Sequence, residues 1–153
     1  MDGLDKKILA ELQIDGRLSV TDLAERVGLS VSPCHRRLKT LEDSGAIAGY
    51  KAQLNASRIG LGFSALVFVT LKEGDNMAVA KFENEVRCIP QVIQAQRLFG
   101  EPDYLLHIVE KDLHAFQALY DSVLSALPYV KRLTSTIVMK EVVTDKPLPM
   151  YPS

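Results

Sequence analysis

The chain has 153 residues, of which 47% are hydrophobic and 24% are charged, and its formal net charge is −1. These values resemble those of soluble globular proteins, which excludes wholesale disorder and a surface that is basic throughout. Two cysteines, Cys34 and Cys88, provide neither a disulfide framework nor a ligand set for structural zinc. No run approaches the ~20 apolar residues of a membrane span, and the charged start lacks the apolar core of a signal peptide, so a cytoplasmic protein is expected.

The first 30 residues predict two short helices. Apolar residues recur at helical spacing between Leu4 and Leu12, and Asp15-Gly16 interrupts the pattern. The segment 19–28 then offers a capping serine, Ser19, followed three residues later by an acid. An apolar stripe and a terminal glycine, Gly28, complete the pattern of a second helix.

A third helix is predicted to follow Leu29. Either Ser30 or Ser32 can cap it, and Pro33 is harmless in a first helical turn because its missing N–H has no partner there. Gly45 is expected to end the helix. The expected inner face consists of Cys34, Leu38 and Leu41. Residues 47–54 alternate loosely, which fits a short strand or a linker.

From residue 61 onward the pattern changes to strands rich in branched and aromatic residues. The predicted strands are residues 63–71, 92–99, 104–109 and 130–143. Between them lie two predicted helices, capped by Asp75 and Asp112 and ended by Pro90 and Pro128. The order β-α-β-β-α-β predicts an antiparallel sheet with both helices on one face, which is a ferredoxin-like domain. The whole chain is therefore expected to be α+β, with domains at 1–60 and 61–153.

A helix, a glycine-containing turn and a second helix with a basic outer face predict a helix-turn-helix motif at about residues 19–44. Between Ser30 and Leu41 the charged side chains are all basic, which suits contacts with base edges and phosphates. The candidate DNA-binding residues are Ser30, Ser32, His35, Arg36, Arg37, Lys39 and Thr40. The alternative is a basic helix face that is simply solvated. Cys34 and His35 do not make a catalytic pair, because neighbours on a helix point about 100° apart.

Two segments resemble the Lrp/AsnC family of leucine-responsive and asparagine-responsive regulators. One is Leu29–Tyr50, together with the opening around Leu4, and the other is the turn Gly100-Glu-Pro-Asp103-Tyr104. Many members have proline where this chain has Val31, so Ser30 and Ser32 are both candidates for the helix cap. The resemblance implies a winged-helix-like DNA-binding domain in a bacterial or archaeal transcription factor. It also implies an effector domain whose sheets pair into dimers and often octamers, with an amino acid bound where dimers meet.

By the same resemblance, the effector site is expected at the Gly100–Asp103 turn and on the last strand. Asp103 would hold the ammonium group, the backbone near Gly100 the carboxylate, and hydroxyl groups would complete the pocket. The candidate residues are Leu98, Gly100, Asp103, Thr134, Ser135 and Thr136. The alternative is that Glu-Pro-Asp is ordinary turn chemistry and that Asp103 bonds only to nearby backbone.

The leading hypothesis is therefore a DNA-binding transcriptional regulator that responds to a small effector. Its expected partners are double-stranded DNA, an amino acid, and further copies of itself as a homodimer and a tetramer or octamer, with no membrane. No metal site, cofactor or catalytic residue is expected, because no convergent set of titratable groups is found. A metabolic enzyme on the same sheet, and a ligand sensor that acts only on proteins, are the competing hypotheses.

Overall fold

The computed structural model describes residues 1–72 and 76–151, which form two compact units. Unit 1 contains Met1–Gln53 and the C-terminal residues from Val142 onward, and unit 2 contains Leu54–Glu141. The predicted bounds, 1–60 and 61–153, do not include this return of the C-terminal residues to the first unit.

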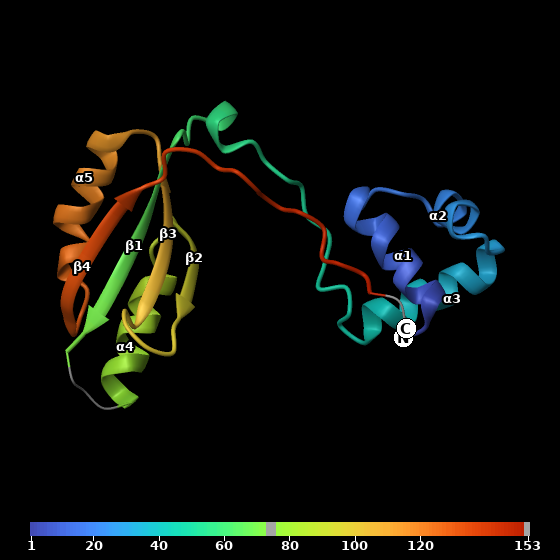
Figure 1. The fold of residues 1–153 in the computed structure, drawn as a ribbon, viewed down its shortest axis with the longest axis horizontal. Helices are drawn as coiled ribbons and strands as arrows, with labels where there is room; N and C mark the ends of the chain where they lie inside the picture. The colour runs from blue at the N-terminus through green and yellow to red at the C-terminus, as the bar shows by residue number, and fades with distance from the viewer. Residues whose placement is uncertain (73–75, 152–153) are drawn as a thin grey trace. The chain divides into compact units, whose positions relative to one another are not determined.

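Unit 1 contains three helices: α1 (Gly3–Ile14), α2 (Val20–Val27) and α3 (Val31–Asp43) (Figure 1). They enclose a small apolar cluster, since each helix contributes one apolar stripe. The fully or nearly buried members are Ile8, Leu9, Leu23, Ala24, Val27, Cys34 and Leu41. Cys34 is completely buried, so its prediction as a core residue is confirmed. Burial also raises the pKa of its thiol, because desolvation disfavours the thiolate.

The turn between α2 and α3 has the predicted chemistry. The side chain of Ser19 accepts a hydrogen bond from the backbone N–H of Asp22 and caps α2. Gly28 ends α2 in the left-handed conformation, with φ of 75°, which glycine adopts without steric cost. Helix α3 begins at Val31, so Pro33 lies in its first turn as expected. Among the described residues of unit 1 no strand forms, so the three helices carry no β-wing. Residues 48–54 have no regular secondary structure, and Ile47 packs on the helical cluster.

The C-terminal segment, defined as residues 142–151, packs on α1. The side-chain amide of Gln13 bonds the backbone of Leu148 twice: its Oε1 accepts from the N–H at 2.6 Å, and its Nε2 donates to the carbonyl at 3.2 Å. Lys6 Nζ donates to the carbonyl of Tyr151 at 2.7 Å. Met150 packs against the apolar cluster of unit 1. Residues more than a hundred positions from α1 therefore belong to the same compact unit.

Unit 2 is built on a four-stranded antiparallel sheet in the order β2-β3-β1-β4. The strands are β1 (Phe63–Leu71), β2 (Val92–Arg97), β3 (Tyr104–Glu110) and β4 (Val130–Ile137). Two helices, α4 (Asn76–Arg87) and α5 (Leu113–Ser122), cover one face (Figure 1). Short 3₁₀ turns, η1 (Ala56–Ile59) and η2 (Leu124–Ala126), precede β1 and follow α5. This is the predicted ferredoxin-like arrangement.

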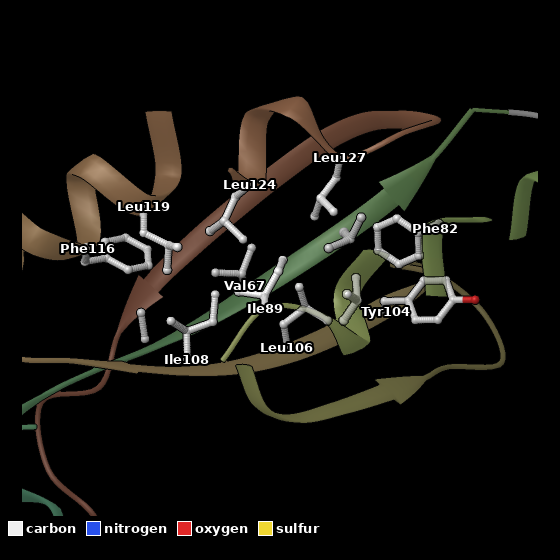
Figure 2. Packing of buried hydrophobic residues seen from close by; sticks show 13 residues of the cluster. Val67, Phe82, Ile89, Tyr104, Leu106, Ile108, Phe116, Leu119, Leu124 and Leu127 are labelled. Carbon is white, nitrogen blue, oxygen red and sulfur yellow. The ribbon is translucent and has the colours of Figure 1, made fainter. Parts of the chain in front are cut away.

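Alternating residues of β1 and β3 meet the helices in one apolar core. Figure 2 shows Val67, Leu106 and Ile108 of the sheet facing side chains from the helical layer. Phe82 of α4 is fully buried, and its ring lies 4.8 Å from that of Tyr104, centroid to centroid. The period-two burial of β1 follows from side chains pointing to opposite faces along a strand.

The element boundaries differ from prediction mainly at the strand ends. The last strand stops at Ile137 rather than residue 143, because the chain then leaves β1, its pairing partner, whose first residue is Phe63. Strand β2 stops at Arg97 rather than residue 99. Asp112 caps α5 as predicted, accepting from the backbone N–H of Ala115 at 2.8 Å. The predicted cap at Asp75 lies outside the described residues.

Candidate functional site

The outer face of α3 carries most of the polar residues that the sequence singles out. Ser30, the N-cap residue, makes no side-chain capping bond. Thr40 donates from Oγ1 to the backbone carbonyl of Arg36 at 3.0 Å. Six of the seven candidates have exposed side chains, namely Ser30, Ser32, His35, Arg36, Lys39 and Thr40. The exception is Arg37.

The adjacent arginines point in different directions. Successive helical residues are about 100° apart, so Arg36 lies about 200° around the axis from the buried Cys34, whereas Arg37 lies about 60° from it. Arg36 is exposed and has no side-chain partner among the described residues. Arg37 is half-buried and bonds to Asp2 and Asp5 beside the first turn of α1, at 2.8 and 2.7 Å. The two residues thus have identical side chains, but the helical period places them on different sides of α3.

Asp2 and Asp5 also form the N-terminal cap of α1. Asp2 is the N-cap residue, and the two carboxylates make a reciprocal capping box. Bonds from the backbone N–H of Asp5 and from Arg37 lower the pKa of Asp2. The same carboxylates, Asp5 first, raise the pKa of Arg37. Sequence reasoning missed this network, although the acid at position 2 and the acid three residues later carry the capping signal.

The predicted effector turn connects β2 to β3. The backbone N–H of Leu98 donates to the carbonyl of Asp103 at 2.8 Å and closes the turn. Gly100 has φ of 124°, a conformation that favours glycine. The carboxylate of Asp103 accepts from the backbone N–H of Leu71 at 2.7 Å, beside an irregularity in the β1–β4 pairing. Asp103 therefore has a structural bond to nearby backbone, and its Oδ1 makes no hydrogen bond within residues 1–72 and 76–151.

A cleft of about 330 Å³ lies beside this turn, at the end of the sheet and the start of α4. Asp103 and Glu101 supply its acids, and its cations are Lys72, Arg97 and Lys131. Tyr104 also lines it; burial, and then the bond from its hydroxyl to Glu83, raise the pKa of Tyr104 to about 12. Opposite charges around one small cavity suit a ligand that carries both a cation and an anion. Sequence reasoning identified Asp103 but missed the cations, which come together only when the strands pair.

The three predicted hydroxyl groups of β4 do not share a surface. Leu133 packs into the core under the helices, so Ser135, two residues later, points to the same side. Ser135 lines a separate cavity with Phe116 and Tyr120 of α5. Thr134 and Thr136 lie on the opposite face of the sheet, as the strand period requires. Within one chain these hydroxyls therefore cannot all reach one ligand.

Residues 1–72 and 76–151 contain neither a cluster of metal ligands nor a helix that could span a membrane. Within these residues no group of three or more His, Cys, Asp or Glu side chains is arranged to hold a metal ion. No helix in the same ranges combines the length and the apolar character that crossing a bilayer requires.

The fold and the exposed basic helix define a protein with a helix-turn-helix domain and a second, ferredoxin-like domain that contains a small cleft. The AsnC-type helix-turn-helix domain profile matches residues 1–42, and the Lrp/AsnC ligand binding domain profile matches residues 64–148. The chain belongs to the Lrp/AsnC family of transcriptional regulators. The resemblance seen in the sequence is confirmed.

Its relatives match along nearly the whole chain. The Bkd operon transcriptional regulator of Pseudomonas aeruginosa is 38% identical over 150 residues, covering 98% of each protein. The leucine-responsive regulatory protein of Rhizobium meliloti is 39% identical over 93% of this chain and 91% of its own length. A transcriptional regulator of Neisseria meningitidis, solved as a complex with L-Met, superposes with a TM-score of 0.93 at 39% identity, covering 97% of this chain and 96% of its own.

Proposed function

We propose that the chain regulates transcription by inserting α3 into the major groove of specific DNA sites. The observation that carries this proposal is the outward face of α3, where Arg36, Lys39 and His35 are exposed. Arg36 is suited to bidentate contact with guanine, and Lys39 to a phosphate. Ser30 and Ser32 lie at the helix N-terminus, where a phosphate is favoured. His35 and Thr40 flank this surface.

We infer that the chain acts as a homodimer and assembles further into tetramers or octamers. Support comes from the sheet face that bears no helix in the described part of unit 2. Leu66 and Phe68 of β1, with Leu105 and Val109 of β3, are half-buried apolar residues on this face. A second sheet covering them would remove apolar surface from water and place two recognition helices about a two-fold axis.

The proposed effector is an amino acid. The cleft beside Asp103 offers acids for an ammonium group and, in Arg97 and Lys131, cations for a carboxylate. Its volume of about 330 Å³ lies at the small end of ligand pockets, which suits a metabolite of this size. The complex of the Neisseria relative with L-Met agrees with this class of ligand. Leu98 and Gly100 shape the turn. Thr134 and Thr136, on the sheet face without helices, would act at contacts with another chain, whereas Ser135 lines the separate cavity beside α5.

This function requires no metal, cofactor or catalytic residue, and we propose that the protein is not an enzyme. Regulation would occur by population shift: the ligand favours one assembly and so changes the spacing of the α3 helices on DNA. A protein that acts on bacterial or archaeal DNA works in the cytoplasm.

The test begins with selection of binding sites from a random duplex library. Arg36→Ala is expected to weaken binding to the selected duplex by about fivefold or more, since one base contact is worth about 1–3 kcal/mol. Affinity should fall steeply as salt rises, because phosphate contacts release counterions. Enrichment of no sequence, or equal retention of the Arg36→Ala variant in a gel shift, would contradict direct reading by α3.

The effector site is tested on the same duplex with each of the twenty amino acids. Asp103→Asn keeps an oxygen that can accept from Leu71 but removes the charge, so it separates ligand binding from turn structure. We expect this variant to bind DNA normally and to lose its response to the amino acid that acts on the unchanged protein. A response that persists in the variant would show that Asp103 does not hold the ammonium group.

A further inference from the structure

We propose that Arg37 is a positioning residue rather than a DNA-reading residue. Together with Asp2 and Asp5 it forms a clamp that fixes α3 against the N-terminus of α1, and Arg36 is the arginine presented to DNA. The proposal rests on the DNA-binding function proposed above. It assigns different roles to two neighbouring arginines: Arg37 positions α3, and Arg36 contacts DNA.

One nitrogen atom makes the connection between the two helices. Arg37 Nη1 donates to Asp2 Oδ2 at 2.8 Å and to Asp5 Oδ1 at 2.7 Å. These distances are typical of charge-assisted hydrogen bonds. Both bonds run from the middle of α3 to the N-cap residue and the first turn of α1, so a rotation of α3 about its axis would break them.

The acids bind Arg37 with oxygen atoms that the helix cap leaves unused. Asp2 Oδ1 accepts from the backbone N–H of Leu4 at 2.9 Å and of Asp5 at 3.0 Å. Asp5 Oδ2 accepts from the backbone N–H of Asp2 at 2.8 Å. All four carboxylate oxygens are therefore bonded, and the cap of α1 and the ion pairs to α3 form one closed network.

This network makes Arg37 poorly suited to DNA. A phosphate or a guanine would have to displace two carboxylates already within hydrogen-bond distance of the guanidinium. The two carboxylates also offset the charge of the guanidinium, which weakens its attraction for a polyanion. Arg36, on the neighbouring face of α3, meets neither obstacle.

The clamp has a consequence for the reading surface. Arg37 and Arg36 are adjacent on one helix. A rotation of α3 that broke the ion pairs would therefore also change the direction in which the Arg36 side chain points. The apolar contacts of α3 that oppose such a rotation are few: Cys34 and Leu41 are buried, and Leu38 packs on the same cluster but is only partly buried. The acids at positions 2 and 5 would thereby set the orientation of a side chain that they do not touch.

The experiment is a double-mutant cycle on the full chain, with a labelled duplex of mixed sequence at low salt as the probe. Arg37→Ala is measured in the unchanged protein and in the Asp2→Asn, Asp5→Asn background, where asparagine still caps α1 but the charges are gone. If Arg37 acts through the acids, its removal weakens binding severalfold in the first background and has little effect in the second. An equal or larger loss in the second background, where the arginine is released to read DNA, overturns the proposal.

Arg36→Ala is the matched control. Its loss of affinity should be largest in the unchanged protein and smaller in the Asp2→Asn, Asp5→Asn background, because the acids then no longer fix the direction of Arg36. It should also lower the slope of log affinity against log salt by about 1 if Arg36 meets a phosphate. Arg37→Ala should leave that slope unchanged. A slope lowered by Arg37→Ala would identify a direct phosphate contact and contradict the clamp.

Two further measurements keep the proposal testable if a variant folds poorly or if DNA binding fails. Arg37→Lys should retain most of the affinity, because one ammonium nitrogen has enough donors for both carboxylates. Urea unfolding should show coupling between Arg37 and the two acids but none between Arg36 and the acids. Absence of that coupling disproves the clamp, whereas failure of the unchanged protein to bind any duplex disproves the proposed function instead.

Discussion

The two units of this protein are stabilised in different ways. Among the described residues, the buried cluster of unit 2 has thirteen members, layered between a sheet and its helices, whereas that of unit 1 has seven. A small domain buries a smaller share of its surface and is correspondingly marginal. Unit 1 supplements its core with polar ties: the Arg37 clamp and the C-terminal segment on α1. The DNA-binding unit therefore depends on contacts that its own first 53 residues do not all provide.

The largest effect is expected from the core of unit 2. Phe82→Ala should reduce the free energy of unfolding by about 3–5 kcal/mol, because the fully buried ring leaves a cavity next to Tyr104. Urea unfolding followed by circular dichroism measures this loss. Phe99→Ala is the matched control, since Phe99 is fully exposed and its removal should change the unfolding free energy little. Similar losses for both variants would contradict the packing of Figure 2.

A smaller loss of stability is expected when the packing of the C-terminal segment on unit 1 is weakened. Met150→Ala is expected to destabilise unit 1 by about 1 kcal/mol, because Met150 is half-buried against the helical cluster. Met139→Ala should have no measurable effect, because Met139 is almost entirely exposed. Hydrogen exchange of the α1 amides reports the difference locally. Unchanged exchange in Met150→Ala would show that the segment does not stabilise α1.

The smallest expected effect is on the way the free energy of unfolding depends on alkaline pH, which should differ between the two units. In unit 2, burial and the bond to Glu83 raise the pKa of Tyr104 to about 12 from its ordinary value near 10. The folded state thus holds the phenol proton more tightly, so this stabilisation is complete below about pH 10 and is lost as the pH rises toward 12. Unfolding free energies measured across this range should fall less steeply in Tyr104→Phe.

Tyr50 allows the same measurement of pH dependence in unit 1. Burial and its bond to Glu42 also raise the pKa of Tyr50 to about 12. About half of its surface is exposed, so solvent screening reduces what the shift contributes to stability. We therefore expect Tyr50→Phe to change the pH dependence less than Tyr104→Phe. The reverse order would contradict the difference in burial.

Much of the fold was predictable because its signals are local. Ser19 and Gly28 mark the ends of α2 through a side-chain cap and a left-handed backbone, both properties of single residues. The alternation of β1 likewise follows from the two faces of a strand. The end of the last strand was not predictable, since branched residues continue to Val143 while pairing with β1 stops at Ile137.

The same distinction between local signals and contacts of distant segments applies to the candidate sites. The exposed basic face of α3 was visible in the helical period, and that period also places Arg37 off this face. Its partners, Asp2 and Asp5, lie more than thirty residues away, and no local pattern connects them. The cations around Asp103 come from the residue after β1, from β2 and from β4, so only strand pairing assembles that cleft.

By itself, the sequence determined the helices, the glycine turn, the order of the strands and the membership of the Lrp/AsnC family, because each depends on short-range periodicity or on contiguous motifs. The tertiary structure alone decided which arginine is bound by acids, which hydroxyls share a face and where the C-terminal residues pack. Those outcomes depend on distances between segments far apart in the chain, and such distances are set by the packing of the whole unit.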